Sequence, residues 1–375
     1  MAGGGEGAFI GAVHRIAARL DDRYELVAAA LSSNAERAAS SAAAIGLDPQ
    51  RSYADYREMA RAEATRPDGA EVVAIVTPNH LHAPMARAFL EAGMHVICDK
   101  PLAISLDEGR ALARLAREKQ RLFALTHTYS GYPMVRHARA LVKAGELGEI
   151  RLVQSEYQQD WLSHPIELDG SSKQASWRAD PAKSGPVGCL GDIGTHAYQL
   201  AAFVTRMTPS HVSAELCTFV EGRRLDDHVQ MMLRYASGAR GLLWASQVAA
   251  GCENTVRLRV FGTKAGLAFD QEHPNELWLT PVGGAAQRLT RGRVGSEAAV
   301  HATRLPAGHP EGFLEAFAQL YTDAAEQIHA LAEGRQPLAA SLDLSTADDG
   351  LAGHRFIDAV LASHRQDAHW VAIAG

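Results

Sequence analysis

Short apolar runs alternate with segments of helical periodicity over the first third of the chain. Four runs are nearly continuous in apolar residues, as buried parallel strands are: Glu25–Leu31, Glu71–Thr77, His95–Asp99 and Arg121–His127. Four segments before or between them predict helices: Phe9–Leu20, Ala35–Ile45, His80–Ala92 and Leu106–Lys119. Strands that alternate with helices in this way are typical of a doubly wound α/β sheet.

After His127 the pattern changes to that of half-buried strands. Polar and apolar residues alternate from Glu149 to Trp161, which predicts a strand with one face exposed. Two later stretches turn at Ser237–Gly238 and at Thr263–Gly266, and these turns predict β-hairpins. Two further helices are predicted, at Val187–Thr205 and Glu311–Glu333.

The predicted organisation is two domains, which fits a length of 375 residues. Residues 1–127 are predicted to form a Rossmann doubly wound parallel sheet, so that the fold class of this part is α/β. Residues 128–375 are predicted to form an α+β domain with a large, mostly antiparallel open sheet.

Composition narrows the range of partners. The net charge of −6 argues against a nucleic-acid partner, and no Lys/Arg run or long apolar stretch suggests a membrane. The first residues lack the basic and apolar regions of a signal peptide. The cysteines contain no CxxC pair, which argues against a zinc site and a disulfide framework. We therefore expect a cytoplasmic protein that needs no metal. The four cysteines are Cys98, Cys189, Cys217 and Cys252.

The opening stretch MAGGGEGAFIG predicts a turn that binds a pyrophosphate. Gly3, Gly5 and Gly7 allow close approach of the backbone, and the N–H groups that open the next helix attract an anion. These N–H groups belong to Ala8, Phe9 and Ile10. The spacing departs from GxGxxG, so a glycine-rich tail is the alternative.

The strand before this turn is expected to be truncated. Only Met1 and Ala2 precede the glycines, although the first strand of a doubly wound sheet is central. A missing central strand would expose apolar neighbours and unpaired strand edges. We therefore expect the native chain to have several apolar residues upstream of Met1. If it begins at Met1, a stunted strand and a looser phosphate site are expected.

The end of the second predicted strand bears on the choice of cofactor. A carboxylate here would bind the adenosine ribose of NAD, but the sequence reads LSSNAER. Ser32, Ser33 and Arg37 could instead bind the 2′-phosphate of NADP. Alternatively, Ser33 or Asn34 caps the next helix. The sequence leaves NAD and NADP both open.

Two motifs follow the ends of the next predicted strands. The turn that contains Thr77, Pro78 and Asn79 leads into a helix near His82. The second motif is Asp99-Lys100-Pro101, which places Lys100 at the carboxyl end of a parallel strand, where open α/β sheets bind ligands. A lone lysine is more often a solvated surface charge.

The stretch GCLGDIGTHAYQL places Asp192 four residues before His196. On an α-helix this spacing puts both side chains on one face. A carboxylate beside an imidazole stabilises the protonated ring and suits a general base. The alternatives are a surface pair or a buried structural histidine.

In combination these motifs resemble the Gfo/Idh/MocA family of oxidoreductases over essentially the whole chain. The lysine-proline hallmark of the family corresponds to Lys100-Pro101, and its Asp-x-x-x-His pair to Asp192 and His196. The resemblance implies that Lys100 orients the substrate hydroxyl and reaches the cofactor ribose. It also implies that His196 is the general acid/base and that Asp192 binds substrate and tunes the histidine.

The resemblance extends to further contacts and to assembly. It implies a cofactor site that includes Thr77, Pro78, Asn79, His82 and Asp99, with Asn79 and His82 beside the nicotinamide. It suggests substrate contacts, and a homodimer or homotetramer formed through the second-domain sheet. The suggested substrate-binding residues are Tyr129, Lys173, Trp177 and Arg178.

The predicted function is hydride transfer between NAD or NADP and a secondary alcohol of a sugar, glycoside or cyclitol. One alternative is a glycoside hydrolase that recycles its bound NAD internally. Another is a dinucleotide-binding protein without catalysis, because a fold alone does not establish activity. The sequence does not identify the substrate.

Overall fold

Contacts within the chain divide it into two compact units. The computed structural model describes residues 1–168 and 172–374, without the side chain of Lys173. The first unit comprises Met1–Thr128 and Phe313–Leu351, and the second comprises Tyr129–Gly312 and Ala352–Gly375. The predicted boundary at residue 127 lies beside this division. Residues 313–351 differ, because they pack with the first unit, whereas the sequence assigned them to the second domain.

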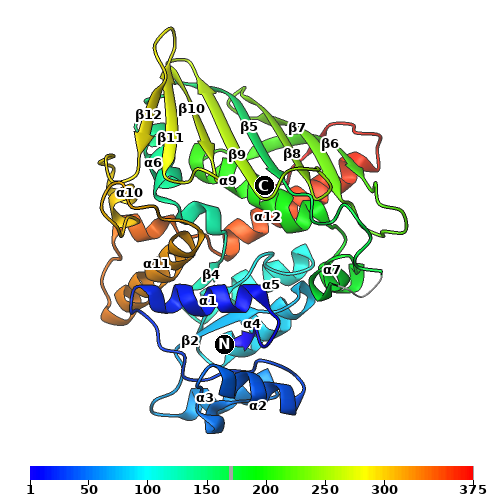
Figure 1. Ribbon diagram of the computed structural model, residues 1–375, viewed down its shortest axis with the longest axis vertical. Helices are drawn as coiled ribbons and strands as arrows, with labels where there is room; N and C mark the ends of the chain where they lie inside the picture. Colours follow the sequence, from blue (N-terminus) through cyan, green and yellow to red (C-terminus); the bar gives the residue numbers. More distant parts are fainter. Residues whose placement is uncertain (169–171, 375) are drawn as a thin grey trace. The chain divides into compact units, whose positions relative to one another are not determined.

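The first unit contains a four-stranded sheet in the order β1-β2-β3-β4 (Figure 1). Every pairing in it is parallel, as the Rossmann prediction requires. β1 has the expected central place, since Ala2 faces β2 on one side and Ala30 on the other. The strands are β1 (Ala2–Gly3), β2 (Val72–Val76), β3 (His95–Cys98) and β4 (Phe123–Leu125).

The strand predicted at Glu25–Leu31 is wrong in its extent. This segment pairs through two isolated bridges, Ala2 with Ala30 and Ala29 with Ser52. A continuous β-ladder needs a neighbouring strand along its length. Because β1 consists of Ala2 and Gly3 alone, it is too short to pair with the whole segment. The segment therefore takes the place of a strand in the sheet without forming a continuous ladder.

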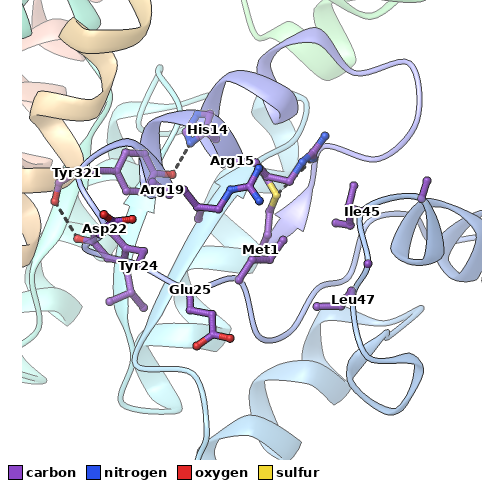
Figure 2. A pocket seen from close by; sticks show the side chains of 16 residues that line it. Met1, His14, Arg15, Arg19, Asp22, Tyr24, Glu25, Ile45, Leu47 and Tyr321 are labelled. Carbon is purple, nitrogen blue, oxygen red and sulfur yellow. Dashed lines mark hydrogen bonds between the residues drawn. The ribbon is translucent and has the colours of Figure 1, made fainter.

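Helices cover both faces of the parallel sheet, as predicted. Alternate residues of a strand point to opposite faces, so Val96 packs with α4 and α5, whereas Ile97 packs with α1 and α11. The buried ring of His14 on α1 lies with Nδ1 2.7 Å from the hydroxyl of Tyr321 on α11 (Figure 2). This contact joins residues 313–351 to the first unit. The helices are α1 (Phe9–Leu20), α4 (His82–Glu91), α5 (Leu106–Glu118) and α11 (Phe313–Glu333).

Side-chain caps fix the starts of several other helices in this unit. The carboxylate of Asp55 accepts hydrogen bonds from the first turn of α3, and Ser105 caps α5 in the same way. The sequence analysis missed α3, and it merged η2 with α4 into one helix. These elements are α2 (Ala35–Ala44), α3 (Tyr56–Thr65) and the 3₁₀ turns η1 (Pro49–Arg51), η2 (Asn79–Leu81) and η5 (Ala339–Asp343). The 3₁₀ turn η3 (Thr128–Gly131) continues into the second unit.

The second unit contains a nine-stranded sheet in the order β12-β11-β10-β9-β5-β8-β7-β6-β13. Within the described residues, β5–β8 is the one parallel pairing of this sheet, so the predicted large, mostly antiparallel sheet is confirmed. Both predicted hairpins are present, as β7–β8 and β9–β10. The strands are β5 (Ile150–Gln158), β6 (Pro209–Cys217), β7 (His228–Tyr235), β8 (Arg240–Ser246), β9 (Thr255–Gly262), β10 (Ala265–Asp270), β11 (Glu276–Pro281), β12 (Gln287–Thr290) and β13 (Val371–Ala372).

Helix α9 packs against one face of this sheet, on β5, β8 and β9 (Figure 1). The opposite face follows the alternation of the strands and is exposed at every second residue of β7. In the described part of the chain, no helix has the length and hydropathy to span a membrane. The helices of this region are α6 (Pro133–Lys143), α7 (Lys173–Arg178), α8 (Pro181–Ser184), the π-helix η4 (Leu190–Gly194), α9 (Thr195–Thr205), α10 (Glu297–His301) and α12 (Ala347–His364).

Candidate active-site residues

The glycine turn after β1 is closely packed against its surroundings. A Cβ on Gly5 would lie 2.7 Å from the carbonyl oxygen of Leu31, and one on Gly11 would lie 2.5 Å from the Cα of Gly4. Gly3 and Gly7 have positive φ angles of 80° and 77°. The guanidinium of Arg15 donates to the Gly4 carbonyl at 2.8 Å. The turn therefore depends on glycine for its shape.

A cavity of about 510 Å³ opens at this turn and at the start of α1. Ala8 stands at the N-cap, and its methyl group cannot accept the N–H groups of the first turn. The N–H of Ala8 itself donates to the carbonyl oxygen of Gly5 at 3.1 Å, so the anion-binding role predicted for it is wrong. The N–H groups of the first helical turn can bind an anion, as at other helix N-termini. The turn, the cavity and the helix start thus fit a dinucleotide pyrophosphate. Gly5, Gly7, Ala8 and Phe9, all predicted cofactor residues, line the cavity.

The residues after segment 25–31 show which side chain caps α2, a choice that the sequence left between Ser33 and Asn34. Asn34 is the N-cap of α2, because its side chain accepts from the backbone N–H of Arg37 at 2.9 Å. Ser32 supports this turn by accepting from the N–H of Asn34 at 3.2 Å. Ser33 and the side chain of Arg37 are exposed. The capping role thus falls to Asn34 and leaves Ser33 and Arg37 for a ligand.

His82 joins the two predicted motifs of the first unit. Its Nδ1 lies 2.6 Å from the carbonyl oxygen of Pro101, and its Nε2 lies 2.9 Å from that of Thr77. The ring is fully buried, and burial lowers its pKa. Asn79 is also buried, at the start of η2. His82 therefore lies between the Thr77 turn and the Lys100-Pro101 turn, with one ring nitrogen facing a carbonyl oxygen of each.

Asp99 organises the turn that carries Lys100. Its Oδ1 accepts from the N–H of Lys100 and from the hydroxyl of Thr126, each at 3.0 Å. The Lys100-Pro101 peptide bond is cis. His127 follows β4 nearby, and burial together with the Lys100 ammonium lowers its pKa to about 3. A partly exposed lysine thus lies beside the Asp99 carboxylate and the buried His127 at the carboxyl end of β3, the place that was predicted.

In the second unit, Asp192 lies in a π-helical turn. The sequence predicted a regular helix from Val187, but η4 precedes α9 and has the wider i→i+5 spacing. The buried carboxylate of Asp226 accepts from the N–H of Gly188 at 2.6 Å and from that of Leu190 at 2.7 Å. Burial raises the pKa of Asp226 to about 6, although these two donors lower it. Asp226 therefore anchors the start of the turn.

A hydrogen bond from Gln247 and an ion pair with Arg178 hold the carboxylate of Asp192. Gln247 donates from Nε2 to Oδ2 at 2.9 Å, and the Nε of Arg178 lies 3.3 Å from the same oxygen. The guanidinium of Arg178 also stacks over the ring of Trp177, 4.2 Å from its centroid. Gln174 accepts from both residues. The predicted residues Trp177, Arg178 and Asp192 are thus brought together, whereas the side chain of Lys173 lies outside the described residues.

His196 is buried against two tyrosines. The Tyr129 ring meets its imidazole edge-on, with centroids 5.0 Å apart, and the Tyr157 ring lies at 6.1 Å. The two tyrosine hydroxyls are 2.7 Å apart, and Tyr157 donates to Oδ1 of Asn254 at 2.7 Å. Asn254 also accepts from Gln159 at 2.8 Å. An aromatic wall and a chain of hydrogen bonds therefore fix the surroundings of His196.

Sequence reasoning missed several residues of this region. Gln247, Asp226, Tyr157 and Asn254 come from strand ends and loops, where local spacing carries no chemical signal. The only hint was the acidic pair Asp226-Asp227 directly before β7. Among the described residues, no cluster of three His, Cys, Asp or Glu side chains is arranged for a metal ion.

Comparison with known proteins identifies the family. Residues 2–127 match the oxidoreductase family with an NAD-binding Rossmann fold, and residues 135–268 match the GFO/IDH/MocA C-terminal domain. The chain belongs to the Gfo/Idh/MocA family. It is an oxidoreductase with a dinucleotide-binding domain for NAD or NADP, and the sequence-based resemblance is confirmed.

Three proteins similar to this chain are an oxidoreductase, an inositol dehydrogenase homologue and a levoglucosan dehydrogenase. An oxidoreductase from Sinorhizobium meliloti is 48% identical, with a TM-score of 0.88 over 99% of this chain and 97% of that one. An inositol dehydrogenase homologue from Azotobacter vinelandii, complexed with NADH and myo-inositol, is 36% identical, with a TM-score of 0.91 over 99% and 96%. Levoglucosan dehydrogenase from Pseudarthrobacter phenanthrenivorans is 31% identical over 75% of this chain and 76% of that protein.

Proposed function

We propose that this oxidoreductase transfers a hydride between NAD or NADP and a secondary alcohol of a sugar, glycoside or cyclitol. The observation that carries the proposal is the paired anchoring of Asp192 by Gln247 and Arg178, on the turn that leads into His196. This arrangement suits a site that must orient a hydroxyl and move its proton. The relatives that bind myo-inositol and levoglucosan support the substrate class.

In the proposed chemistry, His196, Lys100 and Asp192 each have a separate role. His196 accepts the proton of the substrate hydroxyl, and the ammonium of Lys100 stabilises the negative charge that develops on the oxygen. Asp192 accepts a hydrogen bond from a substrate hydroxyl and favours the protonated imidazole. The nicotinamide, when bound, supplies the hydride acceptor. These roles for Lys100, Asp192 and His196 are proposals based on the family motifs.

The glycine turn and the start of α1 are the proposed site of the pyrophosphate. Ser32, Ser33 and Arg37 are proposed to contact the adenosine ribose or its phosphate. A hydroxyl and a guanidinium suit the 2′-phosphate of NADP, whereas the A. vinelandii homologue is complexed with NADH. His82 is proposed to act indirectly, because both its ring nitrogens already face the Thr77 and Pro101 carbonyls. The remaining proposed contacts are Gly3, Gly5, Gly7, Ala8, Phe9, Ile10, Thr77, Pro78, Asn79, Asp99 and Lys100.

The substrate is proposed to lie beside Tyr129, Trp177 and Arg178, with Lys173 as a further contact. Aromatic faces pack on the C–H surfaces of a ring, while Arg178 and Asp192 offer a donor and an acceptor to its hydroxyls. A polyhydroxylated ring satisfies both requirements.

A screen of both cofactors against cyclitols, sugars and glycosides tests this function. The panel includes myo-inositol, scyllo-inositol, levoglucosan, glucose and aryl glucosides. Reduced cofactor that accumulates in proportion to oxidised alcohol supports the proposal. Glycoside cleavage without net cofactor reduction contradicts it and indicates a hydrolase. Tight cofactor binding with no turnover of the whole panel also contradicts it.

We further propose a homodimer or homotetramer formed through the open face of the nine-stranded sheet. This face carries exposed large apolar side chains, and two of them, Met232 and Leu242, line a hollow of about 610 Å³. Contiguous exposed apolar surface is typical of protein interfaces. The apolar residues of this face are Leu152, Met232, Leu242, Phe261 and Trp278.

We also propose a reducing, cytoplasmic location. The four cysteines are free thiols, which fits such a location.

A further inference from the structure

A buried guanidinium, that of Arg223, joins two loops of the second unit. Its Nε and Nη2 donate to the two carboxylate oxygens of Glu167 at 2.7 and 3.1 Å. Its Nη1 donates to Oδ2 of Asp227 at 3.1 Å. The side chains of Arg223, Glu167 and Asp227 are 2%, 4% and 0% exposed. One cation therefore pairs with two carboxylates away from solvent.

The loop of Arg223 leads into the acidic dipeptide Asp226-Asp227, directly before β7. Asp226 accepts three consecutive N–H groups at the start of the η4 turn. Its carboxylate accepts those of Gly188 and Leu190, and its carbonyl oxygen accepts that of Cys189 at 2.8 Å. The start of the turn that carries the proposed active-site aspartate is thus bonded to one residue of this dipeptide.

Asp227 connects the same dipeptide to the donor that holds Asp192. The carbonyl oxygen of Asp227 accepts from the N–H of Gln247 at 2.9 Å, and the side chain of Gln247 donates to Asp192. The carboxylate of Asp227 also accepts from the N–H groups of Phe219 and Val220. The dipeptide therefore contacts both the η4 turn and the residue that orients the Asp192 carboxylate.

Three carboxylates lie close together in this part of the unit. Burial, followed by the charges of Asp226, Asp192 and Asp227, raises the pKa of the Cys189 thiol. The pKa of Asp226 is raised to about 6, mainly by burial and also by the charge of Asp227. A buried carboxylate without a counter-ion favours the protonated form of its neighbours. Arg223 supplies a counter-ion at Asp227.

We propose that Arg223 is a positioning residue for the proposed active site, and that it acts through Asp227 and Asp226 on the turn that carries Asp192. The inference rests on the proposed function. The guanidinium balances the charge of Asp227, so that Asp226 stays ionised beside it and accepts the N–H groups of the turn. Without the guanidinium, Asp226 binds a proton at higher pH, and one of its oxygens becomes a donor. The turn then loses an acceptor, and Asp192 loses its fixed orientation.

Two substitutions in one ion pair test this role, because they change the local charge in opposite directions. Arg223→Gln removes the cation, whereas Glu167→Gln removes an anion and leaves the cation with Asp227. We expect the pH midpoint of Asp226 to rise by about one unit in Arg223→Gln and to fall in Glu167→Gln. The amide shift of Leu190 reports this midpoint, because its N–H donates to Asp226. NMR of ¹⁵N-leucine-labelled protein measures it without turnover.

Kinetics then show whether the charge of Arg223 reaches the active site. With the alcohol found in the screen, kcat/KM of Arg223→Gln relative to the unsubstituted chain should be about fivefold lower at pH 6 than at pH 8. Arg223→Lys keeps the charge and should restore the pH dependence. Arg51→Gln is the matched control, since Arg51 forms a buried ion pair with Glu63 in the first unit. It should lower Tm as Arg223→Gln does but leave the pH dependence of kcat/KM unchanged.

The outcomes separate positioning from stability. An unchanged Leu190 midpoint in Arg223→Gln, or midpoints that move in the same direction in both variants, overturns the proposal. A shifted midpoint without any change in the pH dependence of kcat/KM also overturns it. Where Arg223→Gln does not fold, a lower midpoint in Glu167→Gln supports the proposal and an equal or higher one overturns it. Absence of turnover in the unsubstituted chain contradicts the proposed function, whereas an unchanged Leu190 midpoint overturns the role of Arg223 in either case.

Discussion

Gln247 donates a hydrogen bond from Nε2 to Oδ2 of Asp192 over 2.9 Å. The donor lies just beyond β8 and the acceptor in the π-helical turn η4, 55 residues earlier in the chain. Arg178 approaches the same oxygen from α7. Three separate elements of the second unit therefore determine the orientation of one carboxylate.

Removal of this donor should impair turnover more than folding. In Gln247→Leu, Asp192 loses this hydrogen bond and keeps its ion pair with Arg178, and a lost bond to a charged group costs about 1–3 kcal/mol. We expect kcat/KM to fall about tenfold or more, with a larger loss in Gln247→Glu because two carboxylates then face each other. Steady-state kinetics and thermal unfolding measure the two effects. The exposed substitution Gln366→Leu is the control. Unchanged kinetics in both Gln247 variants would remove Gln247 from the site.

Substitution of the proposed catalytic residues should lower kcat strongly. Lys100→Met removes the cation that stabilises the alkoxide, and His196→Ala removes the proton acceptor. We expect losses of about 100-fold or more in each, as for other general acid-base groups. Lys119→Met, an exposed lysine at the end of α5, is the matched control and should retain wild-type activity. A kcat within about tenfold of wild type in either catalytic variant contradicts the assigned role.

Stability should decrease as the pH falls below neutrality. Burial lowers the pKa of His14 and His354 to about 4 and that of His127 to about 3. Because the unfolded chain binds these protons near pH 6.5, their contribution is fully present above pH 6.5 and is lost as the pH falls toward 4. Each group contributes a slope of up to about 1.4 kcal/mol per pH unit.

Urea unfolding at several pH values between 7.5 and 5 measures this effect. His354→Gln should reduce the slope of unfolding free energy against pH, because one of the titrating rings is gone. An unfolding free energy that stays constant over this range in the unsubstituted chain would contradict the assignment of neutral, buried histidines.

The open sheet face should control assembly. Leu242 and Met232 lie on neighbouring strands and are 54% and 49% exposed. Arginine at both positions places charge in the proposed apolar interface and should shift the protein toward monomer at micromolar concentration. Light scattering after size exclusion gives the mass. Leu331→Arg, an equally exposed leucine on α11, should leave the mass unchanged. Wild-type mass in the double variant would place the interface elsewhere.

Local periodicity predicted most of the helices and strands but not their long-range partners. α1 has the predicted bounds Phe9–Leu20, because its apolar stripe and the glycine turn before it are both local signals. The place of residues 313–351 depends on contacts such as His14 with Tyr321, about 300 residues apart, which no local pattern encodes. The strand predicted at Glu25–Leu31 was wrong because its ladder depends on the length of β1.

The same distinction applies to the candidate site. Lys100, Asp192 and His196 could be selected from the sequence because their motifs are short and contiguous. Gln247 and Asp226 reach the same turn from distant segments, and the N–H groups of Gly188 and Leu190 at the start of the π-helix donate to Asp226. The spacing of four residues between Asp192 and His196 predicted that both lie on one regular α-helix. In the structure Asp192 lies in the π-helix η4 and His196 in α9.

Deuterium transfer tests the central claim most directly. The first alcohol of the screen that is turned over is prepared with deuterium on its carbinol carbons and incubated with oxidised cofactor and the enzyme. We expect reduced cofactor that carries one deuterium at C4 of the nicotinamide, in an amount equal to the ketone formed. The same experiment with His196→Ala should give at least 100-fold slower labelling. Cofactor that remains oxidised and unlabelled with every member of the panel would contradict the account.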